Sequence, residues 1–269
     1  MELKGAGELV DRIGVRLHPT RDDTAILPVS PAVVRDGEFL VAALMLAADI
    51  ASGVRLHDPN VPMVLTTSFA LRRATRTAIG LVNAIPTRLF EDGRRFVDRV
   101  DFRGGAGEAV ATGRISFVVR RPDEASPKTY RDVLSQFRKE WAQPIQQPLI
   151  KAAGIETVDA ARGCVTMRAG SDVRRKVGML QGAFVTLLGE ASALVLAEHH
   201  YQAPAVVESL DVEYLAAATA DTVTTEARWL DVAGESDIEV VLRSDAIGED
   251  HGGLPLAVFL IGVARADSR

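Results

Sequence analysis

Two long apolar segments, one in each half of the chain, most strongly restrict the folds that are open to it. They are "FLVAALMLAADIASGV" at residues 39–54 and "VGMLQGAFVTLLGEASALVLAEH" at residues 177–199, and each carries a buried-looking carboxylate, Asp49 or Glu190. An unpaired carboxylate is costly to move out of water, so it needs a partner, a proton or a wet cleft. The uncharged apolar runs are too short for a comfortable membrane span. The pattern therefore predicts two core helices, each with one acid to explain.

The two acids occupy matching positions in an internal repeat. A shift of 141 residues lays the first half on the second without a gap for about sixty positions, and it places Asp49 on Glu190. Few residues are identical, but further pairs mark corresponding turns, helix positions and strand positions: Gly37 with Gly178, Ala42 with Ala183, Ser68 with Ser209, Gly93 with Gly234 and Val100 with Val241. We expect the shift to stay constant over this range.

Each predicted helix is followed by strands joined by short turns. A run with alternating apolar positions comes first, "VLTTSFALRRA" in the first half and "AVVESLDVEYLAAA" in the second. A hairpin follows, turning at Asp92-Gly93 and at Ala233-Gly234, and a last apolar strand closes each half. With one short strand before each helix, this order predicts an α+β fold in which an antiparallel sheet wraps a buried helix.

The repeat also divides the chain. We expect an N-terminal unit over residues 1–121, a linker helix over 122–148 and a C-terminal unit over 149–269. The linker has apolar residues at helical spacing until Pro144 and Pro148 interrupt it. The repeat predicts an internal pseudo-dimer in which the two sheets join edge to edge and the two helices run antiparallel.

Charge and composition narrow the function. The chain has 269 residues, of which 47% are hydrophobic, and a formal net charge of -5, with neither a lysine-rich tail nor zinc-type Cys/His spacing. Its one cysteine excludes an internal disulfide, and the N-terminal "MELKGAGELVDRIG" lacks the pattern of a signal peptide. We therefore expect a cytoplasmic protein that binds neither nucleic acid nor membranes and holds no metal.

The helix pattern "G-x-L-x-G-x-x-x-x-x-L-x-E" and the strand "SLDVEYLAAA" resemble the hotdog fold. The resemblance is to acyl-CoA thioesterases of the PaaI and 4-hydroxybenzoyl-CoA groups, and two such units in one chain resemble a double hotdog. It implies a chain that hydrolyses an acyl-CoA to free acid and CoA, with coenzyme A as part of the substrate and no other cofactor. It also implies a homodimer of double hotdogs.

The resemblance further implies where a site would lie. Family members usually place a helix-borne acid eight residues after a glycine whose N–H faces the substrate, as Glu190 follows Gly182 here, and have His-Gly-Gly where this chain has Gln181-Gly182-Ala183. Because paired hotdog helices run antiparallel, the resemblance places Gly182 opposite Asp49 and Val41 opposite Glu190. Only the first pairing keeps both the glycine and an acid.

These residues suit thioester hydrolysis. The N–H groups of Gln181 and Gly182 at a helix start could stabilise an oxyanion. Asp49 could act as general base on water or attack directly, and Thr66, on the next strand, could orient the water or the carboxylate. The candidate catalytic residues are therefore Asp49, Thr66, Gln181, Gly182 and Glu190.

Three alternatives remain open from the sequence. Either acid could simply pair with an arginine across the interface between the halves, and Gln181-Gly182 could be no more than a helix start. The protein could be a catalytically silent double hotdog that binds acyl-CoA or an acyl chain. A hotdog dehydratase or hydratase is a weaker alternative, because the catalytic histidine with its Asn-Pro or acidic motif is not found.

Overall fold

The structure, a computed structural model, describes residues 9–21, 23–54, 63–75, 80–120, 144–174, 178–230, 237–244 and 255–267. Two long helices lie within these ranges, α1 (Val41–Val54) and α4 (Gly182–Tyr201), together with the short helices η1 (Leu9–Arg12) and α3 (Leu149–Ala152). Nearly every residue of α1 is buried, as its predominantly apolar sequence predicts.

The first long helix forms within its predicted apolar segment, and the second overlaps its segment and continues two residues beyond it, to Tyr201. The second begins five residues later than the apolar run, at Gly182, because the side chain of Gln181 accepts a hydrogen bond from the N–H of Ala183 and caps the first turn. It ends where Gln202 takes a left-handed conformation.

The strands follow the predicted order. The first half contains β1 (Arg16–Leu17), β2 (Ala25–Pro28), β3 (Val34–Arg35), β4 (Glu38–Phe39), β5 (Met63–Arg73), β6 (Leu81–Glu91), β7 (Arg95–Gly104) and β8 (Ala109–Arg120). The second half contains β9 (Ile155–Asp159), β10 (Cys164–Arg168), β11 (Ala205–Tyr214), β12 (Thr222–Trp229), β13 (Asp237–Ser244) and β14 (Pro255–Arg265). The short strands β1, β3, β4 and β9 were not predicted from the sequence.

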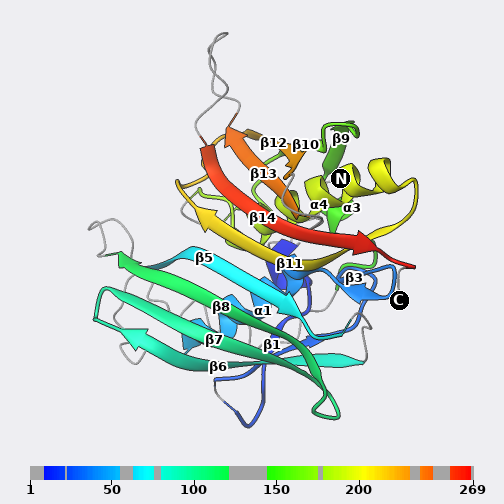
Figure 1. Ribbon diagram of the computed structural model, residues 1–269. Coiled ribbons are helices and arrows are strands. Elements are labelled where there is room, and N and C mark those ends of the chain that lie inside the picture. The colour runs from blue at the N-terminus through cyan, green and yellow to red at the C-terminus, as the bar shows by residue number, and fades with distance from the viewer. Residues whose placement is uncertain are drawn as a thin grey trace, which may run out of the picture.

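Twelve of the strands form one antiparallel sheet in the order β1-β2-β6-β7-β8-β5-β11-β14-β13-β12-β10-β9. Strands of the first half occupy one side of this order and strands of the second half the other, so β5 and β11 meet in the middle (Figure 1). Buried and exposed residues alternate along β7 and β13, and the buried face packs against the helices. Figure 1 shows α1 behind β5, β7 and β8.

The central pair of strands keeps the 141-residue offset. Arg72 of β5 pairs with Ser209 of β11, and Ser68 pairs with Glu213. Subtracting 141 from the β11 residue numbers maps Ser209 onto Ser68 and Glu213 onto Arg72. Each of the two pairs therefore maps onto the other. α1 and α4 begin at positions separated by the same number of residues.

The offset is not constant as far as Val100, and this part of the sequence prediction is wrong. Val100 is buried whereas Val241 is half-exposed. The reason is a bulge between Arg88 and Phe90, which adds one residue to β6. The residue of β6 that pairs with Val100 and the residue of β12 that pairs with Val240 are 141 positions apart. Val240, rather than Val241, therefore corresponds to Val100.

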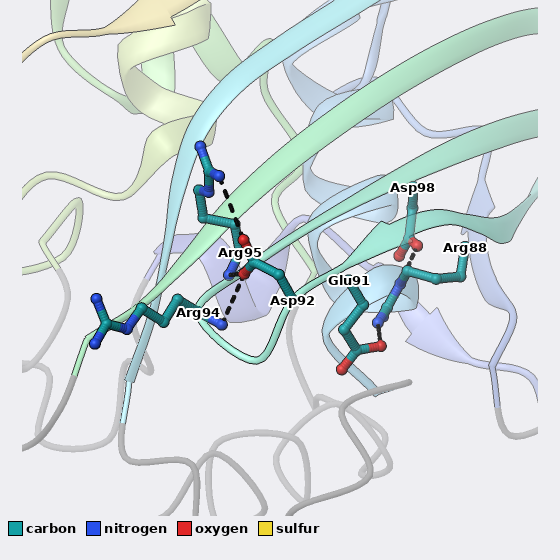
Figure 2. A network of polar contacts seen from close by, with 6 residues as sticks. All are labelled: Arg88, Glu91, Asp92, Arg94, Arg95 and Asp98. Carbon is teal, nitrogen blue, oxygen red and sulfur yellow. Dashed lines mark hydrogen bonds and ion pairs between the residues drawn. The ribbon is translucent and has the colours of Figure 1, made fainter.

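The β6–β7 hairpin turns where the sequence predicts (Figure 2). Gly93 has a φ of 77°, a conformation that glycine adopts without strain. Asp92 closes the turn by accepting hydrogen bonds at Oδ1 from the N–H groups of Arg94 and Arg95, at 3.0 and 2.7 Å. These bonds lower the pKa of Asp92. The turn predicted at Ala233-Gly234 and the linker helix up to residue 143 lie outside the described residues.

The same hairpin holds a buried ion pair. Asp98 of β7 is fully buried, and its Oδ1 lies 2.6 Å from Nε of Arg88 on β6, which also contacts Glu91 (Figure 2). The Arg88 guanidinium lies over the ring of Phe96, 4.5 Å from its centroid.

In the described part of the chain, no helix is long and apolar enough to cross a membrane.

Candidate active site

The site lies where α1 and α4 contact each other. Glu190, in the middle of α4, accepts a hydrogen bond from the N–H of Val41 at 2.8 Å and another from the N–H of Ala42 at 3.0 Å. Gln181, at the start of α4, donates to Asp49 in α1. Each helix start thus faces the acid of the other helix, so the two helices run antiparallel.

Both oxygens of Glu190 bind backbone rather than an arginine side chain. Glu190 is only 1% exposed. Burial raises its pKa, and this effect outweighs the lowering by the N–H groups of Val41 and Ala42 and by the more distant charges of Arg73 and Arg35. The acid therefore serves as a cap for the first turn of α1, whose N–H groups have no partner within the helix.

Asp49 is held by two side chains. The hydroxyl of Thr66 donates to its Oδ1 at 2.7 Å, and Nε2 of Gln181 donates to its Oδ2 at 3.4 Å. Asp49 and Gln181 are 7% and 6% exposed, whereas Thr66 is half-exposed. The structure thus brings together three of the five candidate residues, from α1, β5 and the residue before α4.

The amide of Gln181 bridges two groups. Its Oε1 accepts from the N–H of Ala183 while its Nε2 faces Asp49, so the orientation of the amide is consistent with both bonds. The backbone N–H of Gln181 donates to the carbonyl of Val173 at 3.2 Å. The expectation that this N–H is available to an oxyanion is therefore wrong. Within the described residues, the N–H of Gly182 has no acceptor.

Gly182 lies at the partly exposed border of this buried cluster. A Cβ atom at this position would lie 3.1 Å from Cε of Met45 and 3.7 Å from the hydroxyl of Tyr214. Tyr214 in turn is within 2.7 Å of the Thr186 hydroxyl and donates to the carbonyl of Gly182 at 3.3 Å. Glycine therefore allows Met45 and Tyr214 to pack close to the start of α4.

Sequence reasoning missed Met45, Thr186 and Tyr214. Each occupies an ordinary position of an apolar helix or an alternating strand, so no local signal distinguishes it from a core residue. Their neighbours become apparent only when α1, α4 and β11 are packed together.

The Glu190 end lacks the polar groups of the Asp49 end. Under the 141-residue shift, the amide, the glycine and the hydroxyl become apolar side chains: Leu40, Val41 and Val207. The bulge beside Thr66 in β5 recurs beside Val207 in β11, which supports this correspondence. At the Asp49 end a carboxylate, a hydroxyl and an amide come together at the start of α4, whereas at the Glu190 end both carboxylate oxygens bind backbone N–H groups.

In the part of the chain that the structure describes, no group of three or more His, Cys, Asp or Glu residues could hold a metal ion. No protein-family model matches the chain, and no curated protein matches its sequence.

Solved structures match over nearly the whole chain at low identity. A conserved protein of unknown function with hot dog fold from Alicyclobacillus acidocaldarius is 12% identical, with a TM-score of 0.61 and coverage of 97% of this chain and 98% of that one. An acyl-ACP thioesterase from Bacteroides thetaiotaomicron is 10% identical, with a TM-score of 0.59 and coverage of 90% and 97%. An acyl-CoA thioesterase II from Mycobacterium marinum is 12% identical, with a TM-score of 0.56 and coverage of 96% and 97%.

Proposed function

We propose that this chain, which has the hotdog fold, hydrolyses acyl thioesters at a site built on Asp49. The observation that carries the proposal is the cluster at the start of α4, where a buried carboxylate is held by Thr66 and Gln181 beside the N–H of Gly182. The names of the matched structures give acyl-CoA and acyl-ACP as substrates of those proteins. We propose an acyl-CoA as the substrate here.

The proposed reaction begins with a water molecule beside Asp49. The carboxylate takes one proton from the water, and the oxygen attacks the thioester carbonyl carbon. The oxyanion that forms accepts a hydrogen bond from the N–H of Gly182, where the positive end of the α4 dipole adds to the stabilisation. The tetrahedral intermediate then expels the thiolate, which receives the proton from Asp49, and leaves the free acid.

Thr66 and Gln181 orient the base in this scheme. Their bonds fix the orientation of the Asp49 carboxylate, which has about four acceptor positions. Direct attack by Asp49 on the carbonyl is the alternative route. It would form an acid anhydride on Asp49. Hydrolysis of this anhydride at the Asp49 carbonyl would leave the product acid of a single turnover in ¹⁸O-labelled water unlabelled, whereas attack of water on the thioester always labels it.

We also propose that the chain is a tandem double hotdog with units at residues 1–121 and 149–269. The exchange of strand pairs between β5 and β11 and the reciprocal contacts of α1 and α4 support this division. The active site then combines the acid of the N-terminal unit with the helix start of the C-terminal unit. The homodimer and the cytoplasmic location stay predictions, and a mass measurement in solution decides the first.

Incubation with short, long and aromatic acyl-CoAs, with a thiol reagent to detect free CoA, tests the proposed function. We expect release of CoA that depends on Asp49. If acyl-CoA binds but neither the panel nor an acyl-ACP is hydrolysed, the chain is instead a catalytically silent acyl-CoA-binding protein. Hydration of an enoyl-CoA would identify a hydratase.

A further inference from the structure

Hydrogen bonds join α1 and α4 at two points, each between the start of one helix and the acid of the other. At one point the N–H groups of Val41 and Ala42 bind Glu190, and at the other Asp49 binds Gln181. Along α1 the two points are eight residues apart, which corresponds to about 12 Å along a helix. Because a helix is stiff over two turns, the contact at Glu190 restricts how far α1 can slide along α4.

The contact at Glu190 is the stronger of the two. It consists of two bonds of 2.8 and 3.0 Å between a carboxylate and backbone N–H groups, and the acid is 1% exposed. At the other point, a single bond of 3.4 Å joins the Gln181 amide to Asp49. The contact at Glu190 therefore resists sliding of the two helices more than the contact at Gln181 does.

The surroundings of Glu190 favour a structural role for this acid over a catalytic one. Its oxygens already bind both N–H groups of the facing helix start, and no glycine opens the approach, because Val41 stands there. Val207 takes the place at which a hydroxyl supports Asp49. To reach the N–H groups of Val41 and Ala42, a thioester carbonyl would have to displace a buried carboxylate that accepts a hydrogen bond from each of them.

We propose that Glu190 is a positioning residue that fixes the axial register of α1 on α4 and so places Asp49 against Thr66 and Gln181. This inference rests on the proposed function for its effect on turnover, but not for its effect on structure. A displacement of about 1 Å at a reacting group can cost on the order of a hundredfold in rate, so even a small slide of α1 is felt at Asp49.

The full-length Glu190→Gln variant tests the proposal. A glutamine can accept from only one of the two N–H groups without turning its own NH₂ toward the other. We expect hydrogen exchange at the amides of Val41 and Ala42 to become at least about tenfold faster, and kcat to fall about tenfold with KM unchanged. Glu198→Gln is the matched control, because Glu198 also lies on α4 but binds the Arg35 side chain. Glu198→Gln should leave the hydrogen-exchange rates of both amides unchanged.

A length test separates positioning from simple loss of charge. Glu190→Asp is too short to reach both N–H groups and should resemble Glu190→Gln. Adding Leu40→Gln to Glu190→Asp would recreate the bridge seen between Gln181 and Asp49, in which the amide oxygen binds the second N–H of the helix. We therefore expect it to restore protection of Ala42 and to restore kcat.

Unchanged protection of Val41 and Ala42 in Glu190→Gln would overturn the proposal. So would a loss of kcat as large as that of Asp49→Asn with both amides still protected, because Glu190 would then act in the chemistry. If the parent protein turns over no thioester, the exchange measurement still tests the register, and only the proposed function fails.

Discussion

At the scale of single residues, one methylene group distinguishes the two helix acids and decides what each one reaches. Glu190 extends to the N–H groups of Val41 and Ala42, so backbone satisfies both of its oxygens. Asp49 is shorter, and the Gln181 side chain spans the remaining distance to α4. The same kind of position therefore yields a structural cap at one end and a candidate general base at the other.

If the protein is a thioesterase, Asp49→Asn should lower turnover by on the order of a hundredfold or more, because an amide cannot accept the proton of the attacking water. Glu190→Gln should lower it much less. Release of CoA measures both, and thermal melts must first establish that each near-isosteric variant folds. Equal losses with the amides of Val41 and Ala42 still protected would mean two working sites, and a larger loss for Glu190→Gln with both amides protected would reverse the assignment.

Burial raises the pKa of Glu190 above the ordinary value of 4.5, although the N–H groups and the charges of Arg73 and Arg35 oppose the shift. The folded protein therefore holds this proton more tightly than the unfolded chain does. The resulting stabilisation is complete below the unfolded pKa and is lost as pH rises through the folded pKa. Relative to Glu190→Gln, the parent should become less stable as pH rises above about 4.5.

Urea unfolding of both proteins across this pH range measures the difference in free energy of unfolding. Use of the glutamine variant as reference cancels the other carboxylates of the chain, which titrate in both proteins. A difference that stays constant with pH, or that grows in favour of the parent as pH rises, would contradict the raised pKa.

At the scale of secondary-structure elements, the β6–β7 hairpin contains a buried ion pair that the fold itself does not require. Arg88 and Asp98 are cross-strand partners on the face toward the core. In the second half, allowing for the bulge, the corresponding partners are Trp229 and Ile238. One hairpin therefore fills this place with charges, and the other fills it with apolar side chains.

Asp98→Ala should lower the free energy of unfolding by about 1–3 kcal/mol, because it removes the buried partner of Arg88 and leaves the partly exposed guanidinium with Glu91 alone. The double variant Arg88→Met/Asp98→Leu should unfold at close to the parent's free energy, since it removes both charges and keeps most of the volume. Urea titrations of the three proteins measure this. Equal destabilisation by the single and the double change would show that the pair is worth its desolvation cost.

At the scale of the whole molecule, the two halves share one sheet and one helix pair. β5 pairs with β11 over five residues, and Arg35 of the first half binds Glu198 of the second at 2.6 Å. The start of each long helix is bonded to the acid-bearing face of the other. Neither half can keep its helix capped and its central strand paired without the other.

Heating should therefore unfold the protein in a single cooperative transition. Calorimetry tests this, because the measured enthalpy should equal the van't Hoff enthalpy if no half-folded state is populated. Two resolved transitions would mean that the halves are stable independently and that the contacts between α1 and α4 contribute little.

Much of the secondary structure could be predicted from the sequence because its signals are local. The apolar helices, the alternating strands and the turn at Asp92-Gly93 are where periodicity and turn chemistry place them, and the matched structures confirm the hotdog fold. The slip of the repeat at Val100 could not be predicted, because a one-residue bulge leaves no signature in composition. The catalytic role of the five candidate residues stays a prediction.

The sequence by itself determined that two buried helices carry one acid each, since apolar periodicity and the cost of a buried charge are properties of a short segment. Only the tertiary structure decided that Glu190 binds backbone N–H groups of the other helix and that Asp49 binds side chains. The deciding bonds join Val41 to Glu190 across 149 residues and Gln181 to Asp49 across 132. Whether a side chain reaches such a partner depends on distances of about 1 Å between packed helices, and these arise only when the whole core is assembled.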